Sequence, residues 1–198
     1  VSEALHEQKI AQIASKIASH SDEIKIVLIA GPTSSGKTTF SKRLAIQLLT
    51  HGISPFPIEM DNYFVERDKT PKDEFGNYDF ESLKALDLDT MAEHLALLLE
   101  GKSIQLPRFN FRTGLREAGE IVRLKENQII LIEGIHGLNP DLLVDIDKQK
   151  KFRIYVSCLT QLNLDRYNRI STTDTRLLRR IVRDAHSRGF TAERTIGM

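Results

Sequence analysis

The sequence predicts an α/β fold, in which a parallel sheet is flanked by helices and carries an inserted β-hairpin. Four short, mostly apolar runs have the character of buried strands, and helical patterns lie between several of them. The segment 103–127 instead has two extended arms around a turn, as in a hairpin. With 198 residues, 40% of them hydrophobic and 28% charged, the chain suits one well-buried domain.

The expected elements follow in chain order. Residues 1–20 are assigned to an N-terminal amphipathic helix, because Ile10, Ile13 and Ile17 repeat at helical spacing within Leu5–Ser19. Residues 21–198 are assigned to the domain itself. The expected strands are Ile24–Ala30, Phe56–Met60, Gln128–Ile132 and Phe152–Ser157, and the expected helices are Lys37–Leu49, Leu83–Leu99 and Pro140–Val144. The hairpin, Ser103–Asn127, is expected to turn near Thr113 and Gly114.

Charge and cysteine content argue against several classes of protein. Lys and Arg number 28 against 27 Asp and Glu, so no overall basic field indicates nucleic acid as a partner. The single cysteine, Cys158, excludes an internal disulfide framework. No apolar run approaches the roughly 20 residues of a membrane span. With no signal-peptide pattern at the start, we expect a cytoplasmic protein without a membrane partner.

The stretch "GPTSSGKTTF" lies between the first expected strand and a helix. It fits the pattern G-x-x-x-x-G-K-[ST], a P-loop, in the context that the motif requires. Small residues let successive backbone N–H groups turn toward a phosphate chain, and the following helix adds its positive dipole end. Lys37 is expected to reach the β and γ phosphates of ATP, and the Thr38 hydroxyl to bind Mg²⁺. The expected ATP-binding residues of the loop are Gly31, Pro32, Thr33, Ser34, Ser35, Gly36, Lys37, Thr38 and Thr39.

Two carboxylates are expected at the carboxyl ends of strands. Glu133 ends the strand in "LIEGIHG", and Asp61 follows the strand in "IEMDNYF". These ends face the ligand crevice of an open parallel sheet. Beside a P-loop, the pair suits a magnesium site and a general base for an attacking hydroxyl. A helix N-cap or a surface ion pair is the alternative for each. No N-K-x-D motif is present, which argues against a GTPase.

The C-terminal segment is rich in arginine. Between Gln161 and Met198 there are eight arginines, no lysine and four acids. Arg176, Arg180 and Arg183 fall on one helical face. Because the planar guanidinium suits phosphate oxygens, we expect an arginine-rich helical lid that closes on ATP. The alternative is a solvated helix in which Asp184 pairs with Arg180 or Arg188.

Several segments together resemble the uridine/cytidine kinases of the phosphoribulokinase and uridine kinase group: "GPTSSGKTTF", "EMDNYF", "NYDFESLKALD", "LPRFNF", "LIEGIHGLNP" and "TRLLRRIVRDAHSRG". The resemblance covers nearly everything after residue 23. It implies a P-loop kinase fold and transfer of a phosphoryl group from ATP, with Mg²⁺, to the 5′-hydroxyl of a nucleoside. It also implies roles for single residues: Asp61 as general base, Thr38 and Glu133 as magnesium contacts, Asp79 as ribose partner, Arg180 directed at the nucleoside, and Arg183 and Arg188 as lid arginines near the phosphates.

Two departures from the family pattern bear on the base. Three residues beyond the phenylalanine of "P-x-Y-D-F" the family has a histidine, where this chain has Gly114. The family's "R-G-R-D" is "RGFT" here, with Phe190 replacing the second arginine. By the resemblance both missing residues read the base, so the identity of the base stays open. Phe109, Phe111 and Phe190 are candidates for stacking on it, with core packing as the alternative.

Three functions therefore stay open. A nucleoside kinase leads, because the general base, the metal site and the lid are all present. A sugar-phosphate kinase of the phosphoribulokinase type would use Arg108, Arg112 and Arg116 to hold the phosphate already on its substrate. The altered base-reading positions motivate a third function, a nucleotide-binding regulatory module without acceptor turnover.

The resembling family has a further strand after the lid, whereas this sequence stops at Met198. We therefore expect the domain to be incomplete at its C-terminal end and the 198 residues to be part of a longer polypeptide. One sheet edge would then be unpaired, or covered by another element such as the opening helix. An unpaired edge favours association, so homo-oligomers fit this expectation.

Overall fold

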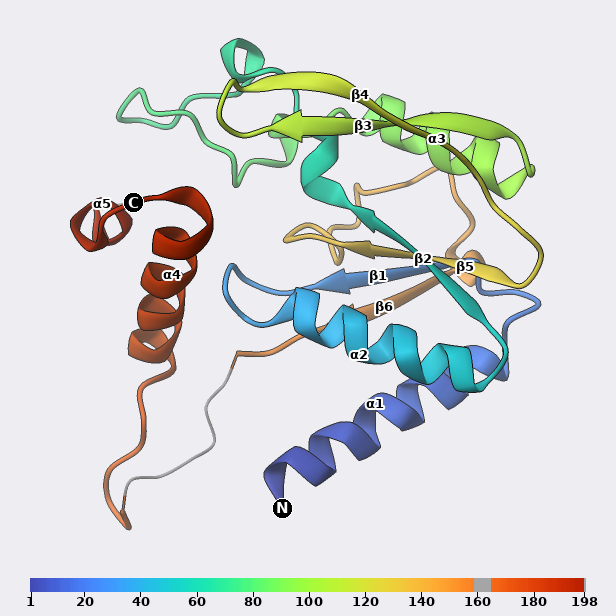
Figure 1. Cartoon of the computed structure of the whole chain (residues 1–198), viewed down its shortest axis with the longest axis horizontal. Coiled ribbons are helices and arrows are strands. Elements are labelled where there is room, and N and C mark those ends of the chain that lie inside the picture. Colours follow the sequence, from blue (N-terminus) through green and yellow to red (C-terminus); the bar gives the residue numbers. More distant parts are fainter. Residues whose placement is uncertain (159–164, 198) are drawn as a thin grey trace.

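A four-stranded parallel sheet forms the centre of the computed structural model, which describes residues 1–158 and 165–197 (Figure 1). The strand order is β2-β5-β1-β6. All five residues of β1 are buried, because it lies between two neighbours and under helices on both faces. The strands are β1 (Ile26–Ala30), β2 (Ser54–Glu59), β5 (Gln128–Glu133) and β6 (Lys151–Tyr155), which confirms the predicted parallel sheet.

Two layers cover the sheet. Helices α1 (Ser2–Ala18) and α2 (Lys37–Thr50) pack on one face, and α3 (Leu88–Leu99) packs on the other with the antiparallel hairpin β3 (Ser103–Asn110) and β4 (Leu115–Arg123) (Figure 1). Alternate side chains of β1 supply the two cores. Val27 and Ile29 belong to the α1–α2 side, whereas Ile26 and Leu28 belong to the α3–hairpin side. The predicted hairpin is confirmed.

Two predicted helices differ from the structure. The helix expected over Leu83–Leu99 begins only at Leu88, because the Asp87 carboxylate accepts a hydrogen bond from Thr90 N at 3.1 Å and caps it there. Residues 140–144 form turns, so the helix predicted over Pro140–Val144 is wrong. Leu143 has a left-handed φ of 59°, which interrupts a right-handed helix, while its side chain is buried in the core.

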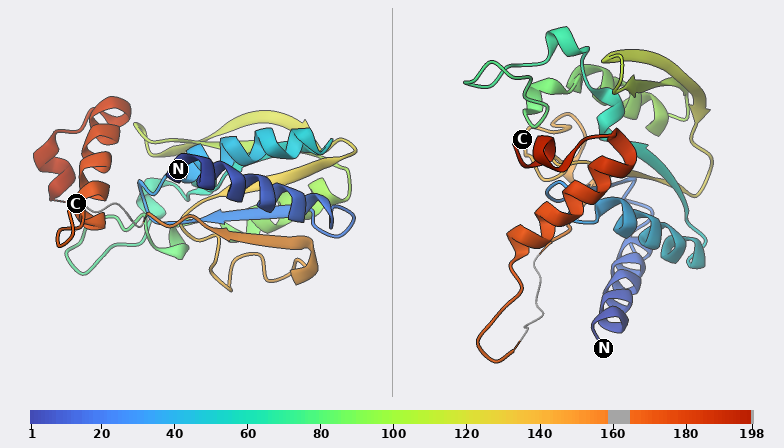
Figure 2. Two further views of the ribbon diagram at one scale, coloured as in Figure 1. Left: turned by 90° about the horizontal axis from the view of Figure 1, so that it is seen from below. Right: turned by 60° about the vertical axis from the view of Figure 1, so that its left-hand side comes forward.

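The remaining helices, all short except α4 (Thr172–Arg188), complete the described part of the chain. The single-turn elements lie in the connections, and α4 and α5 form a separate group facing the carboxyl ends of β1 and β5 (Figures 1 and 2). Helix α4 ends at Gly189, whose left-handed φ of 65° suits a glycine. These elements are η1 (Met60–Tyr63), η2 (Arg67–Lys69), η3 (Leu83–Ala85), η4 (Lys148–Lys150), α4 (Thr172–Arg188) and α5 (Ala192–Ile196).

The two outer strands of the sheet differ in character. Strand β2 carries Pro55 and Pro57, which lack the N–H group of a ladder and therefore suit an edge. Strand β6 pairs with β1, and no second strand pairs with it among the residues that the structure describes. Helix α1 lies near β6, since the Lys16 ammonium is 5.7 Å from the centroid of the Phe152 ring. Self-association through this edge stays a prediction.

No helix in the described ranges is both long and apolar enough to cross a bilayer.

Helix α1 contributes to the core of the sheet. Ile17 is fully buried in one cluster with residues of β1, β5 and α2. We expect Ile17→Ala to lower the free energy of unfolding by about 2–5 kcal/mol, through lost burial and the cavity left behind. Leu5→Ala is the control, because Leu5 is 54% exposed on the same helix and should cost no more than about 0.5 kcal/mol. Equal denaturation midpoints for the two variants would contradict a structural role for α1.

Candidate active site

The phosphate-binding loop joins β1 to α2. Ser34 and Gly36 have left-handed φ values of 62° and 100°, which turn the backbone tightly before the first residue of the helix. A Cβ built at Gly31 would lie 2.5 Å from the carbonyl oxygen of Val156 and 2.8 Å from Ser35 Oγ, so only glycine fits there. The helix N-terminus that follows offers N–H groups and a positive dipole end to an anion.

Lys37 folds back over this loop. Its ammonium donates hydrogen bonds to the carbonyl oxygens of Gly31 at 2.8 Å and Pro32 at 3.2 Å. Burial lowers the pKa of Lys37, while the negative charges of Glu133 and Asp61 oppose that shift. The ammonium therefore lies at the mouth of the loop, close enough to both carboxylates to be affected by their charge.

Thr38 and Glu133 form the second part of the site. The Thr38 hydroxyl donates a hydrogen bond of 2.8 Å to Glu133 Oε1, although the residues are 95 positions apart. Burial raises the pKa of Glu133, and the bond from Thr38 opposes the rise. In the part of the chain that the structure describes, Glu133 Oε2 is buried and accepts no hydrogen bond.

These oxygen atoms fit a magnesium ion. A hydroxyl and a carboxylate lie side by side next to the phosphate loop, and one carboxylate oxygen lacks a partner among the described residues. The described ranges hold no cluster of three or more His, Cys, Asp or Glu residues that could bind a metal alone. Mg²⁺ in phosphoryl-transfer sites characteristically keeps waters and shares one or two protein ligands with the phosphates, so two ligands suffice.

A cleft of about 1810 Å³ runs from the phosphate loop past the end of β2. Asp61 lines it from η1, two residues after the last residue of β2. Glu59 and Glu133 are register partners in β2 and β5, which places the ends of these strands side by side at the cleft. Asp79 also lines the cleft, and its Oδ1 accepts hydrogen bonds from the backbone N–H groups of Glu81 and Ser82. The structure thus brings Lys37, Glu133, Asp61 and Asp79 to one cavity.

Helix α4 closes the phosphate end of the cleft. Arg176 donates two bonds of 3.4 Å to the carbonyl oxygen of Thr33, so the helix touches the phosphate loop directly. Arg180 and Arg183 line the cleft and share the buried carboxylate of Asp184, at 3.8 Å and 2.6 Å. The predicted common face of the three arginines therefore points inward. The side chain of Arg188 lies outside the part that the structure describes.

The phenylalanines predicted to stack on a base divide into two kinds. Phe109 is only 4% exposed and packs edge-on against Phe64, so core packing accounts for most of its surface, although one side of it lines the cleft. Phe111 is 49% exposed and lines the cleft. Phe190 also lines the cleft, with the Arg194 guanidinium 3.8 Å from its ring centroid. Phe111 thus offers more ring surface to a ligand than Phe109 does, whereas the Arg194 guanidinium lies over the ring of Phe190.

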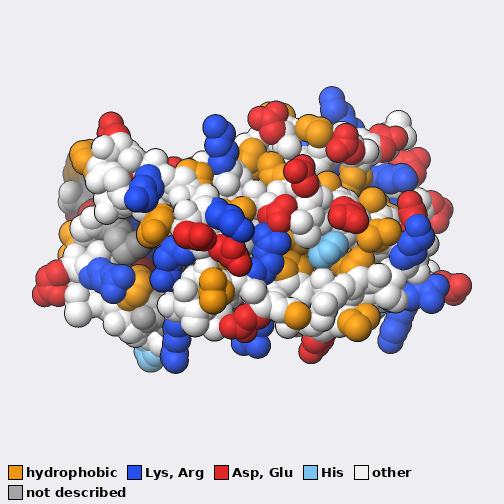
Figure 3. Space-filling view, turned by 90° about the horizontal axis from the view of Figure 1, so that it is seen from above, with side chains coloured by type: hydrophobic (Ala, Val, Ile, Leu, Met, Phe, Trp, Pro, Cys, Tyr) orange, Lys and Arg blue, Asp and Glu red, His pale blue; other side chains and the backbone are white. Residues whose placement is uncertain are grey.

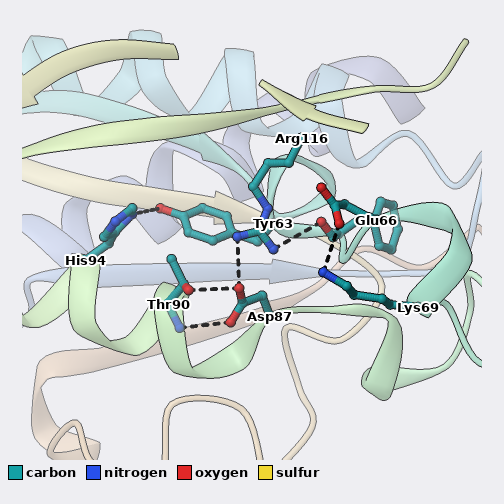
Figure 4. Close-up of polar contacts among 8 residues, drawn as sticks. Tyr63, Glu66, Lys69, Asp87, Thr90, His94 and Arg116 are labelled. Atoms are coloured by element: carbon teal, nitrogen blue, oxygen red, sulfur yellow. Dashed lines mark hydrogen bonds and ion pairs between the residues drawn. The ribbon is translucent and has the colours of Figure 1, made fainter. Parts of the chain in front are cut away.

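Arg116, one of the three arginines considered for a substrate phosphate, lies in a polar network instead (Figure 4). Its guanidinium bonds to Asp87 at 2.8 Å and to the carbonyl oxygen of Phe64 at 3.3 Å. The Tyr63 hydroxyl and His94 Nδ1 form a neighbouring bond of 3.1 Å, and burial raises the pKa of Tyr63 above its usual range. The network ties β4 and α3 to η1 and so helps to position the segment that carries Asp61.

Three arginines that line the cleft were not predicted: Arg67, Arg179 and Arg194. Arg67 lines the cleft from η2, within the charged segment 66–76. The charge of this segment and its Pro71 favour a surface loop that moves over the substrate. Arg179 also lines the cleft, and a Cβ built at Gly36 would lie 3.3 Å from its guanidinium. The arginine-rich run of α4 is a signal that could have identified Arg179. No local signal identifies Arg67, because its place depends on the fold of the hairpin.

Residues 26–197 match the profile of the Phosphoribulokinase / Uridine kinase family. The chain belongs to this family. A uridine kinase of Halobacterium salinarum is 30% identical over 81% of this chain, and the match spans 63% of that relative. A uridine kinase of Halalkalibacterium halodurans is also 30% identical, over 86% of this chain and 72% of the relative. The chain thus spans somewhat less than two thirds of the first relative's length.

Solved structures support the same fold. A structure described as a possible uridine kinase from Bacillus stearothermophilus is 26% identical, with a TM-score of 0.53 over 67% of this chain and 70% of that chain. A structure from Silicibacter sp. TM1040, described as a candidate fructose transport system kinase, has a TM-score of 0.63 and 16% identity. It covers 95% of this chain and 86% of that chain. Membership of the Phosphoribulokinase / Uridine kinase family makes the chain a P-loop, nucleotide-binding protein of a family of ATP-dependent kinases.

Charge is mixed on one face of the protein. On the face that Figure 3 shows, basic and acidic side chains are interspersed, and no broad region carries one sign. The formal net charge is +1. This face therefore offers no extended basic track for nucleic acid.

Proposed function

We propose that the protein transfers the γ-phosphoryl group of ATP to the 5′-hydroxyl of a nucleoside. The observation that carries the proposal is the meeting of Lys37, Glu133 and Asp61 in one cleft, where both carboxylates affect the pKa of the ammonium. A phosphate-binding group, a metal-binding pair and a candidate base are the parts that such a transfer needs. The uridine kinases among the relatives supply the acceptor class.

In this mechanism Asp61 accepts the proton of the 5′-hydroxyl as the hydroxyl oxygen attacks the γ-phosphorus. The new O–P bond forms while the bond between the γ-phosphorus and the bridging oxygen breaks, and ADP leaves with that electron pair. Lys37 holds the β and γ phosphates, and Arg183 neutralises charge that develops on the transferred group. Arg180 is directed at the nucleoside. Mg²⁺ held by Thr38 and Glu133 would supply further charge neutralisation at the same phosphates.

Asp79 is proposed to hold the ribose. Its Oδ1 is occupied by two backbone N–H groups, which fix the orientation of the carboxylate toward the cleft. A fixed carboxylate accepts hydrogen bonds from sugar hydroxyls, and positioning the 5′-hydroxyl in this way is itself a large part of such catalysis. The phosphate end of the cleft is separate, because the basic groups of the loop and of α4 line it.

The experiment is an ADP-release assay with ATP and Mg²⁺ against a panel of nucleosides and of sugar phosphates. Turnover that depends on a nucleoside supports the proposal. Turnover with sugar phosphates alone, or with no acceptor, overturns it. The geometry gives less support to a sugar phosphate, since Arg116 is bound to Asp87 and Arg108 does not line the cleft, which leaves Arg112 of the three.

A further inference from the structure

The candidate base lies on a segment that cannot fix its own shape. Asp61 belongs to η1, a single turn of four residues that follows the edge strand β2. A turn this short closes too few hydrogen bonds to be stable alone, and the bond from Phe64 N to Asp61 O is 3.4 Å long. The position of the Asp61 carboxylate therefore depends on contacts that other elements make with the residues beside it.

Residues 63–65, which overlap the end of η1, pair with residues 85–87, which lead into α3. Two backbone hydrogen bonds of 2.9 Å join them, from Asp87 N to the Tyr63 carbonyl oxygen and from Val65 N to the Ala85 carbonyl oxygen. The Tyr63 side chain is fully buried, and its hydroxyl bonds to His94 Nδ1 on α3 at 3.1 Å (Figure 4). Helix α3 and the residues before it thus support η1.

Arg116 joins the two paired segments from the side of the hairpin (Figure 4). Its Nη1 donates to Asp87 Oδ2 at 2.8 Å, and its Nη2 donates to the Phe64 carbonyl oxygen at 3.3 Å. One planar guanidinium therefore contacts both segments at once, which the compact ammonium of a lysine could not reproduce. The pair is charged at neutral pH: burial would raise the pKa of Asp87, but hydrogen bonds from Thr90 and Arg116 outweigh it and hold the pKa below its usual value.

Arg116 has no direct access to the reacting groups. It is not among the described residues that line the cleft. It lines a separate recess of about 260 Å³ between α3 and the hairpin, together with Thr90 and His94. Any effect of Arg116 on the reaction must therefore pass through the residues that it holds. Among these, Phe64 lies only three positions after Asp61.

We infer that Arg116 is a positioning residue for the general base: by joining Asp87 to the Phe64 carbonyl group, it fixes η1 and thereby the direction of the Asp61 carboxylate. The inference rests on the proposed function and adds to it a residue that touches neither ATP nor the acceptor. A general base must lie within hydrogen-bond reach of the proton that it accepts, and a displacement of about 1 Å can cost roughly 10²-fold in rate. The loss of Arg116 should therefore appear mainly in kcat.

Two variants break the pair from opposite sides. Arg116→Gln and Asp87→Asn are each expected to lower kcat about 10- to 100-fold, measured with ATP and the best nucleoside of the acceptor panel. The KM for ATP should stay nearly unchanged, because other elements form the phosphate loop. Asparagine caps a helix about as well as aspartate, so Asp87→Asn should leave α3 intact. The double variant should be no worse than either single variant, since both remove the same contact.

Two further substitutions serve as comparisons. Arg116→Lys keeps a positive charge beside Asp87 and should recover part of the lost kcat, but not all of it. Arg123→Gln removes an exposed arginine from the same strand, β4, and should leave kcat and both KM values unchanged. Thermal melting of each variant identifies any that fails to fold. If Arg116→Gln is one of these, Asp87→Asn takes its place in the experiment that follows.

A double-mutant cycle with Asp61→Asn separates positioning from a general structural role. If Arg116 acts through Asp61, the variant with both Asp61→Asn and Arg116→Gln should have the kcat of Asp61→Asn alone, within about twofold. A structural role would lower kcat by the same factor in both backgrounds. That result, or a wild-type kcat in Arg116→Gln, would overturn the inference and leave the proposed function standing. If the wild-type protein phosphorylated no nucleoside, the proposed function itself would fail, and the inference with it.

Discussion

Asp61→Asn is expected to lower the turnover number by roughly 10²- to 10⁴-fold, the usual contribution of a general base. Asparagine keeps the size and the polarity of the side chain but cannot accept the proton of the acceptor hydroxyl. Asp61 lies at the cleft surface on η1, and it is not part of either hydrophobic core. The substitution should therefore leave the fold and the binding of ATP nearly intact.

The measurement is steady-state turnover together with ATP affinity from equilibrium titration. Asp68→Asn is the control, because Asp68 is an exposed carboxylate on the neighbouring turn η2 and does not line the cleft. It removes one negative charge from the same region without touching the candidate base. A turnover number of Asp61→Asn close to the wild-type value would remove Asp61 from the mechanism.

The phosphate loop could be predicted from sequence because its geometry is local. Left-handed backbone at Ser34 and Gly36 and the close approach of Ser35 Oγ to Gly31 all arise within ten consecutive residues. The contact between Thr38 and Glu133 spans 95 positions, yet the sequence also predicted that these two residues lie together. Parallel strands bring their carboxyl ends to one edge, and β1 and β5 are neighbours in register from Ile26–Ile130 to Ile29–Glu133.

The remaining features depend on tertiary packing that no periodic pattern encodes. Arg67 meets Gly114 because a single-turn helix packs against a hairpin tip 47 positions later, and neither has a repeating pattern. The helix predicted at Pro140–Val144 fails because Leu142 and Leu143 are buried by turns rather than by one helical face. Arg116, predicted as a possible phosphate ligand, meets Asp87 across the fold. Charge and spacing in the sequence do not distinguish an arginine that binds a carboxylate of the protein from one that binds a ligand.

Lys37→Ala is expected to weaken ATP binding and phosphoryl transfer together. The ammonium contacts the phosphates in both the ground state and the transition state, so its loss affects both steps. A lost hydrogen bond between charged groups raises the KM for ATP about 10- to 100-fold. The loss of a positioned donor to the transferred group lowers kcat by about 10²- to 10³-fold.

The two ammonium groups of helix α2 offer a matched comparison for that experiment. Lys42 lies one turn further along the helix and is exposed, whereas Lys37 is folded over the loop and bonded to the carbonyl oxygens of Gly31 and Pro32. Lys42→Ala removes one positive charge from α2 and places an alanine in the helix, as Lys37→Ala does. It should nevertheless leave the KM for ATP and kcat unchanged. Thermal melting with and without ATP adds a readout that does not need an acceptor, since ATP should stabilise the wild-type protein and Lys42→Ala, but Lys37→Ala much less. Equal stabilisation of all three proteins by ATP would show that Lys37 does not hold the phosphates, and the assignment of the loop would then fail.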